Sequence, residues 1–121
     1  MADETTPQRP DYSISYLEFH VPAVASTKKF YGDAFGWTFE DWGPNYASFG
    51  HENVAGGFTS DQVSATGAPL VILHASKLEE AQARVEKAGG KIVKPIFSFP
   101  GGRRFHFTDP AGNELAIWSE P

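Results

Sequence analysis

Residues 18–37 read EFHVPAVASTKKFYGDAFGW, and this stretch decides the fold because it joins a strand end, a short turn and a helix. Over 13–21, β-branched and aromatic side chains alternate with polar ones, which predicts a strand. Apolar residues then recur at helical spacing over 24–35, and Gly36 favours a helix stop. We therefore expect a strand followed directly by an amphipathic helix.

The same order of elements recurs in the second half of the chain. The apolar run 69–75 predicts a strand, and Ser76 with Glu79 has the capping-box spacing that predicts a helix start. The buried stripe of this helix is predicted at Leu78, Ala81, Val85 and Ala88. Further strands are predicted at 37–42, 45–50 and 53–59, and again at 91–98, 103–108 and 113–119.

The two halves also agree in register. Gly36 and Gly90 end the two helices and are as far apart as His20 and His74, which end the two leading strands. Repetition of a structural unit at a fixed offset indicates duplication. We predict a disordered tail at 1–12 and a single domain at 13–121, built from module one at 13–60 and module two at 68–119.

Composition restricts the classes of function. The 121 residues contain no cysteine, which excludes disulfides, thiolate nucleophiles and cysteine-ligated zinc. The net charge of −5 argues against a nucleic-acid or anionic-membrane partner, because either would require a basic patch. The polar start has no signal-peptide pattern, and no apolar run is long enough to span a bilayer. We expect a cytoplasmic protein.

Three motifs, in this order and spacing, resemble the vicinal-oxygen-chelate superfamily of glyoxalases, bleomycin-resistance proteins and extradiol dioxygenases. They are EFHVPAVASTKKFYGDAFGW (18–37), LEEAQARVEKAGGKIV (78–93) and FTDPAGNELAIW (107–118). The resemblance implies an α+β fold in which tandem βαβββ modules form a curved mixed sheet around a cleft, with the helices on the convex side. It also implies a homodimer.

Metal-dependent members of this family carry His or Glu ligands on the first, fourth, fifth and eighth strands. By register with the family motifs, those positions fall on Tyr16, Gly56, Leu70 and Ala116. Glycine, leucine and alanine side chains have no donor atom, and a phenol is a poor ligand. We therefore expect a member without a metal site and without a cofactor.

Alternate residues of a strand lie on the same face, and this alternation predicts which residues line the candidate site. The predicted ligand-binding residues are Tyr16, Phe58, Ile72, His74, Arg104, His106, Glu114 and Trp118. For catalysis, Glu18 is the candidate base, and His20 or His106 is its candidate acid partner. Glu18 can instead form a structural ion pair with Arg104, and the aromatic residues can simply fill the core.

Four functions remain open. The first is binding of a small organic molecule without metal in an aromatic cleft formed by Tyr16, Phe58 and Trp118. The second is a metal-independent lyase or isomerase that uses Glu18 with a histidine. The third is a divalent-metal lyase or dioxygenase with a displaced site. In that case the ligands would be Glu18, His20, His74 and Glu114. The fourth is a dimeric accessory module without a small ligand.

Overall fold

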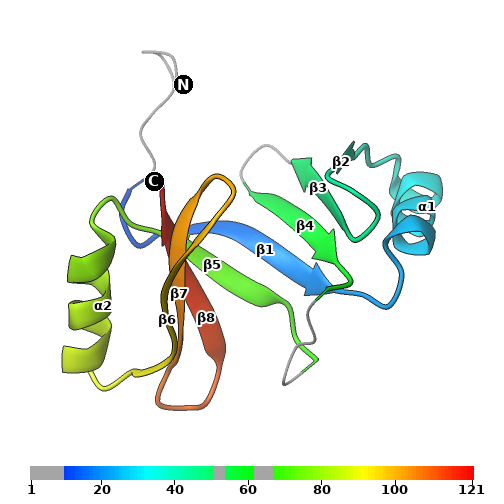
Figure 1. The fold of residues 1–121 in the computed structure, drawn as a ribbon. Coiled ribbons are helices and arrows are strands. Elements are labelled where there is room, and N and C mark those ends of the chain that lie inside the picture. The colour runs from blue at the N-terminus through cyan, green and yellow to red at the C-terminus, as the bar shows by residue number, and fades with distance from the viewer. Residues whose placement is uncertain (1–9, 51–53, 62–66) are drawn as a thin grey trace. The chain divides into compact units, whose positions relative to one another are not determined.

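The computed structural model describes residues 10–50, 54–61 and 67–121. Within these ranges, module one consists of β1 Ile14–His20, α1 Val24–Phe35, β2 Glu40–Asp41, β3 Tyr46–Gly50 and β4 Ala55–Thr59 (Figure 1). Module two repeats the order with β5 Leu70–His74, α2 Leu78–Lys87, β6 Lys91–Phe99, β7 Gly102–Thr108 and β8 Glu114–Ser119. The predicted α+β class and the two βαβββ modules are confirmed.

The chain divides into two compact units that we treat separately. The first unit is Tyr16–Val71, and the second unit is the described residues up to Ser15 together with Ile72–Pro121. In the first unit the strands run in the order β2-β3-β4-β1, and β1 and β4 are parallel. In the second unit the order is β5-β8-β7-β6, and β6, β7 and β8 pair antiparallel. The strands are thus of mixed direction.

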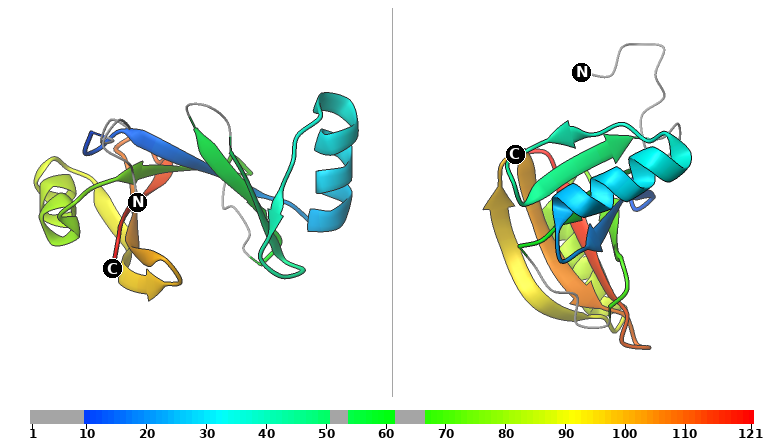
Figure 2. Two further views of the ribbon diagram at one scale, coloured as in Figure 1. Left: turned by 90° about the horizontal axis from the view of Figure 1, so that it is seen from above. Right: turned by 90° about the vertical axis from the view of Figure 1, so that its right-hand side faces the viewer.

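An aromatic core fills the first unit on the side of its helix. Helix α1 packs against β3 and β4 (Figure 2). The core contains Val24, Ala47, Phe49 and Phe58, with Phe19, Val21, Tyr31, Trp37 and Phe39 packed around them. Because side chains alternate along a strand, Phe19 faces this core, while its neighbours on either side in β1 face the other way.

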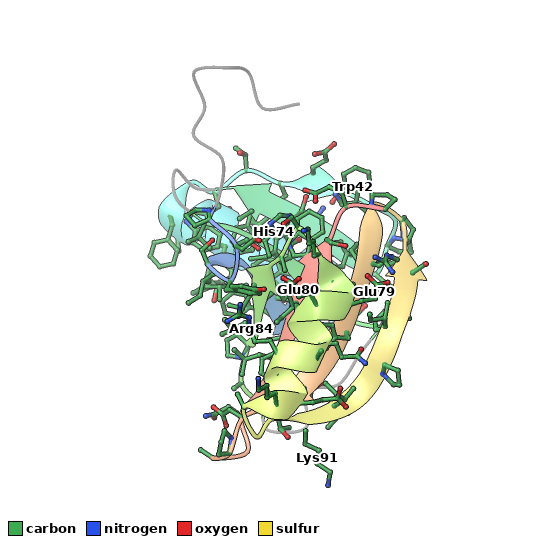
Figure 3. All side chains as sticks on the ribbon, turned by 90° about the vertical axis from the view of Figure 1, so that its left-hand side faces the viewer. Trp42, His74, Glu79, Glu80, Arg84 and Lys91 are labelled. Atoms are coloured by element: carbon green, nitrogen blue, oxygen red, sulfur yellow. The ribbon has the colours of Figure 1, made fainter. Side chains whose placement is uncertain are left out.

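Helix α2 covers one face of the strands of the second unit. It packs against β6, β7 and β8, and Figure 3 shows it lying over them with Glu79, Glu80 and Arg84 along its length. The core beneath it consists of Ala75, Leu78, Ala81, Phe105, Phe107 and Ile117. The alternate residues of β7 and β8 therefore lie on the face turned away from α2.

The predicted capping box at Ser76 and Glu79 is wrong. The N-cap of α2 is Lys77, which is extended and makes no side-chain capping hydrogen bond. The carboxylate of Asp11 instead accepts from the Ser76 N–H at 3.0 Å and from the Ser76 hydroxyl at 2.9 Å. Glu79 pairs with Arg103. Both Ser76 and Glu79 therefore bond to residues distant in sequence and not to each other.

The end of the predicted disordered tail at 1–12 is ordered, because Tyr12 contacts the second unit. The Tyr12 N–H donates to the His74 carbonyl at 2.6 Å, and the Arg84 guanidinium lies 5.0 Å from the centre of the Tyr12 ring. These contacts tie the start of the described chain to the second unit. Residues 1–9 lie outside the described residues, as do parts of the predicted linker 60–68 and of the predicted strand 53–59.

The predicted helix stripes are only partly buried. In α1, Phe30 is 58% exposed and Phe35 is 62% exposed, and their rings contact each other and Tyr31. In the second helix Ala88 is exposed, because the helix ends at Lys87 and Ala88 is its C-cap. Neither helix in the described part of the chain is both long and apolar enough to cross a membrane.

Candidate functional site

The second unit carries a set of residues, polar and aromatic except for one alanine, that we call the polar face. It consists of Arg104 and His106 on β7, with Glu114, Ala116 and Trp118 on β8. Arg104 pairs with Trp118, and His106 pairs with Ala116, in the antiparallel register of these two strands. Cross-strand partners project to the same side of a sheet. The phenylalanines between them on β7 belong to the α2 core, so the polar face lies away from the helix.

His106 is the most buried polar residue of this face. The residue is 1% exposed, and its Nδ1 lies 2.9 Å from Oε2 of Glu114. A carboxylate only accepts hydrogen bonds, so the proton is on Nδ1, and this N–H group donates a hydrogen bond to Glu114. The other ring nitrogen, Nε2, is buried and has no hydrogen-bond partner in the described part of the chain.

The surroundings of His106 favour its neutral form. Burial lowers the pKa of His106, and the positive charges of Arg104 and Lys94 lower it further, while the hydrogen bond to Glu114 acts in the opposite direction. Lys94 is the partner of His106 on β6, and Arg104 lies on β7 itself, so the positive charges come from one neighbouring strand and from the strand of His106. At neutral pH the ring is therefore a neutral imidazole with a lone pair on Nε2.

Arg104 lies against an aromatic wall supplied by β6. Its guanidinium carbon is 5.6 Å from the ring centre of Phe97 and 5.6 Å from that of Phe99. The residue is only 9% exposed. Phe97 also stacks on the ring of His106, with centroids 5.8 Å apart. The wall thus fixes the guanidinium and the imidazole next to each other on β7.

Trp118 lies at the other end of this face and contacts His74 of β5. Their rings meet edge to face with centroids 5.0 Å apart, and the indole N–H donates to the Ser15 hydroxyl at 3.1 Å. The His74 Nε2 atom lies 3.0 Å from a carboxylate oxygen of Glu120, and this hydrogen bond lowers the pKa of Glu120. Both rings are therefore held by hydrogen bonds within the second unit.

A separate polar cluster lies on the first unit, on the side of β1 away from the aromatic core. The hydroxyls of Tyr16 and Tyr46 are 2.5 Å apart, and the Tyr46 hydroxyl donates to Oε2 of Glu18 at 3.2 Å. Burial, then the hydrogen bond to Tyr16 and the charge of Glu18, raise the pKa of Tyr46. Tyr46 therefore acts here as a neutral hydrogen-bond donor. We call these three residues the phenol cluster.

The register of β4 differs from the parity prediction. Glu18 pairs with Gly57 and Phe19 pairs with Phe58, so Gly57, not Gly56, lies beneath the phenol cluster. A Cβ built on Gly57 would meet the hydroxyls of both tyrosines. Phe58 is 1% exposed within the aromatic core. The predicted grouping of Phe58 with Tyr16 is therefore wrong, because β4 is shifted by one residue and its faces are exchanged.

The remaining predicted residues are placed as follows. His20 is the last residue of β1, pairs with Thr59 and is half-buried. Ile72 is 3% exposed, and its carbonyl accepts from the Ser15 hydroxyl at 3.3 Å. Glu18 is 5% exposed. The catalytic role predicted for Glu18 and His20 stays a prediction.

The sequence-derived metal positions have no donor atoms except the Tyr16 phenol. The register correction replaces Gly56 by Gly57, which also lacks a side chain. Ala116 is fully buried beside His106. In the described residues, no group of three or more His, Cys, Asp or Glu side chains could hold a metal ion. The displaced set of Glu18, His20, His74 and Glu114 is not such a group.

Four residues that contact or surround the candidate groups were not predicted from the sequence. Tyr46 on β3 joins the phenol cluster, and Lys94, Phe97 and Phe99 on β6 surround His106 and Arg104. On β6 the register shifts twice, between Ile92 and Lys94 and between Lys94 and Phe97. After such an irregularity, the alternation of side chains along the strand no longer predicts which face a residue occupies. The available signal was Phe97 and Phe99 at alternate positions of one strand.

Comparisons with solved structures support the fold. The chain is similar to the NAD-dependent benzaldehyde dehydrogenase from Legionella pneumophila, with TM-score 0.72, 16% identity and coverage of 88% of this chain and 98% of that chain. It is also similar to the Mn(II)-bound glyoxalase from Novosphingobium aromaticivorans, with TM-score 0.65, 23% identity and 90% coverage of this chain. The match spans 39% of that glyoxalase chain. These likenesses concern the fold alone, because one fold hosts many activities.

A third structure carries the family name directly. It is the glyoxalase/bleomycin resistance protein/dioxygenase superfamily member from Vibrio splendidus 12B01, with TM-score 0.67, 13% identity and coverage of 91% of this chain and 99% of that chain. A comparison with curated proteins found no match. The family model described as Glyoxalase/Bleomycin resistance protein/Dioxygenase superfamily matches residues 13–117. That match spans most of the chain, which belongs to this superfamily.

Proposed function

We propose that the chain binds a small organic anion, with an aromatic or other planar body, on the polar face of its second unit and without a metal ion. The observation that supports this most is the position of Arg104. The residue is 9% exposed, and its guanidinium lies against the rings of Phe97 and Phe99. A fixed cation on an aromatic wall matches the usual make-up of a site for a small charged ligand.

The charges around Arg104 support an anion. Its neighbour on the face, His106, is neutral because its pKa is lowered, Lys94 adds a further positive charge, and the carboxylate of Glu114 is held by its hydrogen bond to His106. The wall residues Phe97 and Phe99 are half-buried, as is Trp118 at the paired position on β8. A planar ligand that stacks on these rings would place its anionic group next to a guanidinium with five N–H donors.

The side chains at the family's ligand positions support binding without a metal ion. Gly57 and Ala116 provide no donor, and the space above Gly57 is occupied by the hydroxyls of Tyr16 and Tyr46. We expect the purified protein, incubated with Ni²⁺, Zn²⁺, Mn²⁺ or Fe²⁺ and dialysed, to hold far less than one ion per chain by mass spectrometry. A stoichiometric, dialysis-resistant metal would refute this part of the proposal.

Calorimetric titration in a buffer with chelator tests anion binding. The probes are benzoate and benzamide, which have similar shape and differ in charge. We expect benzoate to bind more tightly, and Arg104→Gln to weaken it by about ten- to a hundredfold. A charge-assisted hydrogen bond contributes about 1.5–3 kcal/mol, and each 1.4 kcal/mol is about tenfold in affinity.

Arg103→Gln is the matched control for this titration. Arg103 is the adjacent residue on β7, but it projects to the α2 side and pairs with Glu79 at 2.6 Å. It should leave benzoate affinity unchanged. Equal losses in the two variants, or equal affinity for benzoate and benzamide, would contradict a site built on Arg104.

A further inference from the structure

The buried Nε2 of His106 has a chemical consequence beyond binding. The Nδ1–H group donates to Glu114 at 2.9 Å, so the lone pair of the ring is on Nε2. Nε2 is buried and accepts no hydrogen bond from the described residues. A buried acceptor without a partner costs about 1–3 kcal/mol, so such an atom calls for an explanation.

We propose that Nε2 of His106 accepts the proton of a weakly acidic O–H group on the bound ligand, a phenol or an enol, and that Arg104 holds the resulting anion. This inference rests on the proposed function, and it adds the ligand class and a proton transfer. In the step, the O–H bond of the ligand breaks and an N–H bond forms at Nε2. The electron pair stays on the ligand oxygen, and no other reactant is needed.

The geometry prepares the ring for this step. Stacking on Phe97 and the bond to Glu114 fix its plane and its tautomer. A histidine with one nitrogen on a carboxylate and the other facing a proton donor is the arrangement of a general base. After transfer, Glu114 lies beside the imidazolium and stabilises it, which makes Glu114 a positioning residue.

The charged groups around His106 favour the products as well. Lys94 on β6 and Arg104 on β7 disfavour a charged ring, so Nε2 keeps its lone pair until a ligand binds. Once a ligand anion lies against Arg104, its charge offsets theirs, and the imidazolium becomes easier to form. The neutral imidazole and the neutral ligand thereby become an imidazolium and a ligand anion. Glu114 lies beside the imidazolium, and Arg104 lies beside the anion.

The test uses 4-nitrophenol, because its phenolate absorbs visible light and its phenol does not. The matched probe is 4-nitroanisole, which has a similar shape but no acidic proton. At a pH below the pKa of free 4-nitrophenol, we expect addition of the protein to produce the phenolate band in proportion to binding. We expect His106→Asn to bind both probes without producing that band.

A second variant, Glu114→Gln, tests the same step if His106→Asn fails to fold. Its amide oxygen can still accept from the Nδ1–H group, but the variant lacks the negative charge that stabilises the imidazolium formed after proton transfer. We expect bound 4-nitrophenol to ionise about tenfold less readily, a shift of about one unit in the pH profile of the band. Glu79→Gln is the control, because Glu79 is exposed on α2 and pairs with Arg103.

The outcomes separate this inference from the proposed function. Binding of benzoate with no phenolate band from 4-nitrophenol would overturn the proton transfer alone. A band of equal strength in His106→Asn or an unchanged pH profile in Glu114→Gln would also overturn it. Failure of the wild-type protein to bind benzoate would overturn the proposed function, and this inference with it.

Discussion

Replacement of Gly57 by alanine should disrupt the phenol cluster. A Cβ at this position would lie 2.5 Å from the Tyr16 hydroxyl oxygen and closer still to that of Tyr46. Cβ atoms are essentially never found that near to another heavy atom. Both phenols must therefore move, and the chain of hydrogen bonds that ends on Glu18 must lengthen or break.

Two effects set the size of the loss. Overpacking a well-filled interior costs about 1–3 kcal/mol. Loss of one hydrogen bond in the cluster adds about 0.5–1.5 kcal/mol. We therefore expect Gly57→Ala to lower the free energy of unfolding by about 2–4 kcal/mol.

Urea unfolding followed by circular dichroism measures this loss, with Gly50→Ala as the matched control. Gly50 also lies at a strand position, but a Cβ there meets no atom within 4 Å. Its replacement should change stability by less than about 0.5 kcal/mol. In a Tyr46→Phe background, the cost of Gly57→Ala should fall by about 1 kcal/mol, because the nearest obstacle is gone.

Two results would refute this reasoning. One is a Gly57→Ala protein as stable as the Gly50→Ala protein, which would mean that the space above Gly57 is open. The other is strict additivity of Gly57→Ala and Tyr46→Phe, because residues that share a contact must show coupling in a double-mutant cycle.

Two further predictions concern stability. Phe58→Ala should lower the free energy of unfolding in urea by about 3–5 kcal/mol, because the ring is 1% exposed in the aromatic core; a loss below about 1 kcal/mol would place this ring outside the core. Burial lowers the pKa of His106 in the folded state, so the unfolded chain binds more protons on acidification. Its contribution to stability is complete above the ordinary histidine pKa of about 6.5 and is lost as the pH falls toward the folded pKa. His106→Asn should flatten this part of the plot of unfolding free energy against pH. An unchanged plot would show that the pH dependence does not come from His106.

The module order was predictable from the sequence because each element carries a local signal. Alternation over β1 and helical spacing over α1 are properties of a few adjacent residues, and Gly36 takes a left-handed conformation with φ of 74° at the helix end. In module two, Arg104, His106, Glu114 and Trp118 share a face as their parity predicts. Strand parity is decided locally wherever pairing is regular, as it is between β7 and β8.

What failed depended on pairing between distant segments. Two adjacent glycines precede Phe58, and neither has a side chain whose polarity would reveal its face. Only the pairing of β1 with β4 decides that Gly57 lies beneath Glu18. The capping box failed for a related reason, because Asp11 holds Ser76 from far along the chain. Local spacing cannot report such competition.

Among the described residues, the family's ligand positions on β4 and β8 have no donor side chain, and different groups surround each of them. On β4, the place of a ligand-bearing side chain is taken by two phenols above Gly57, so a longer residue there would displace both hydroxyls. On β8, Ala116 is fully buried and pairs with His106, whose imidazole is committed at Nδ1 to Glu114. The polar groups of each module thus bond to one another beside the small residue. Donors that satisfy each other are not arranged to converge on an ion. A single buried lone pair without a partner among the described residues, as at Nε2 of His106, is instead suited to one proton.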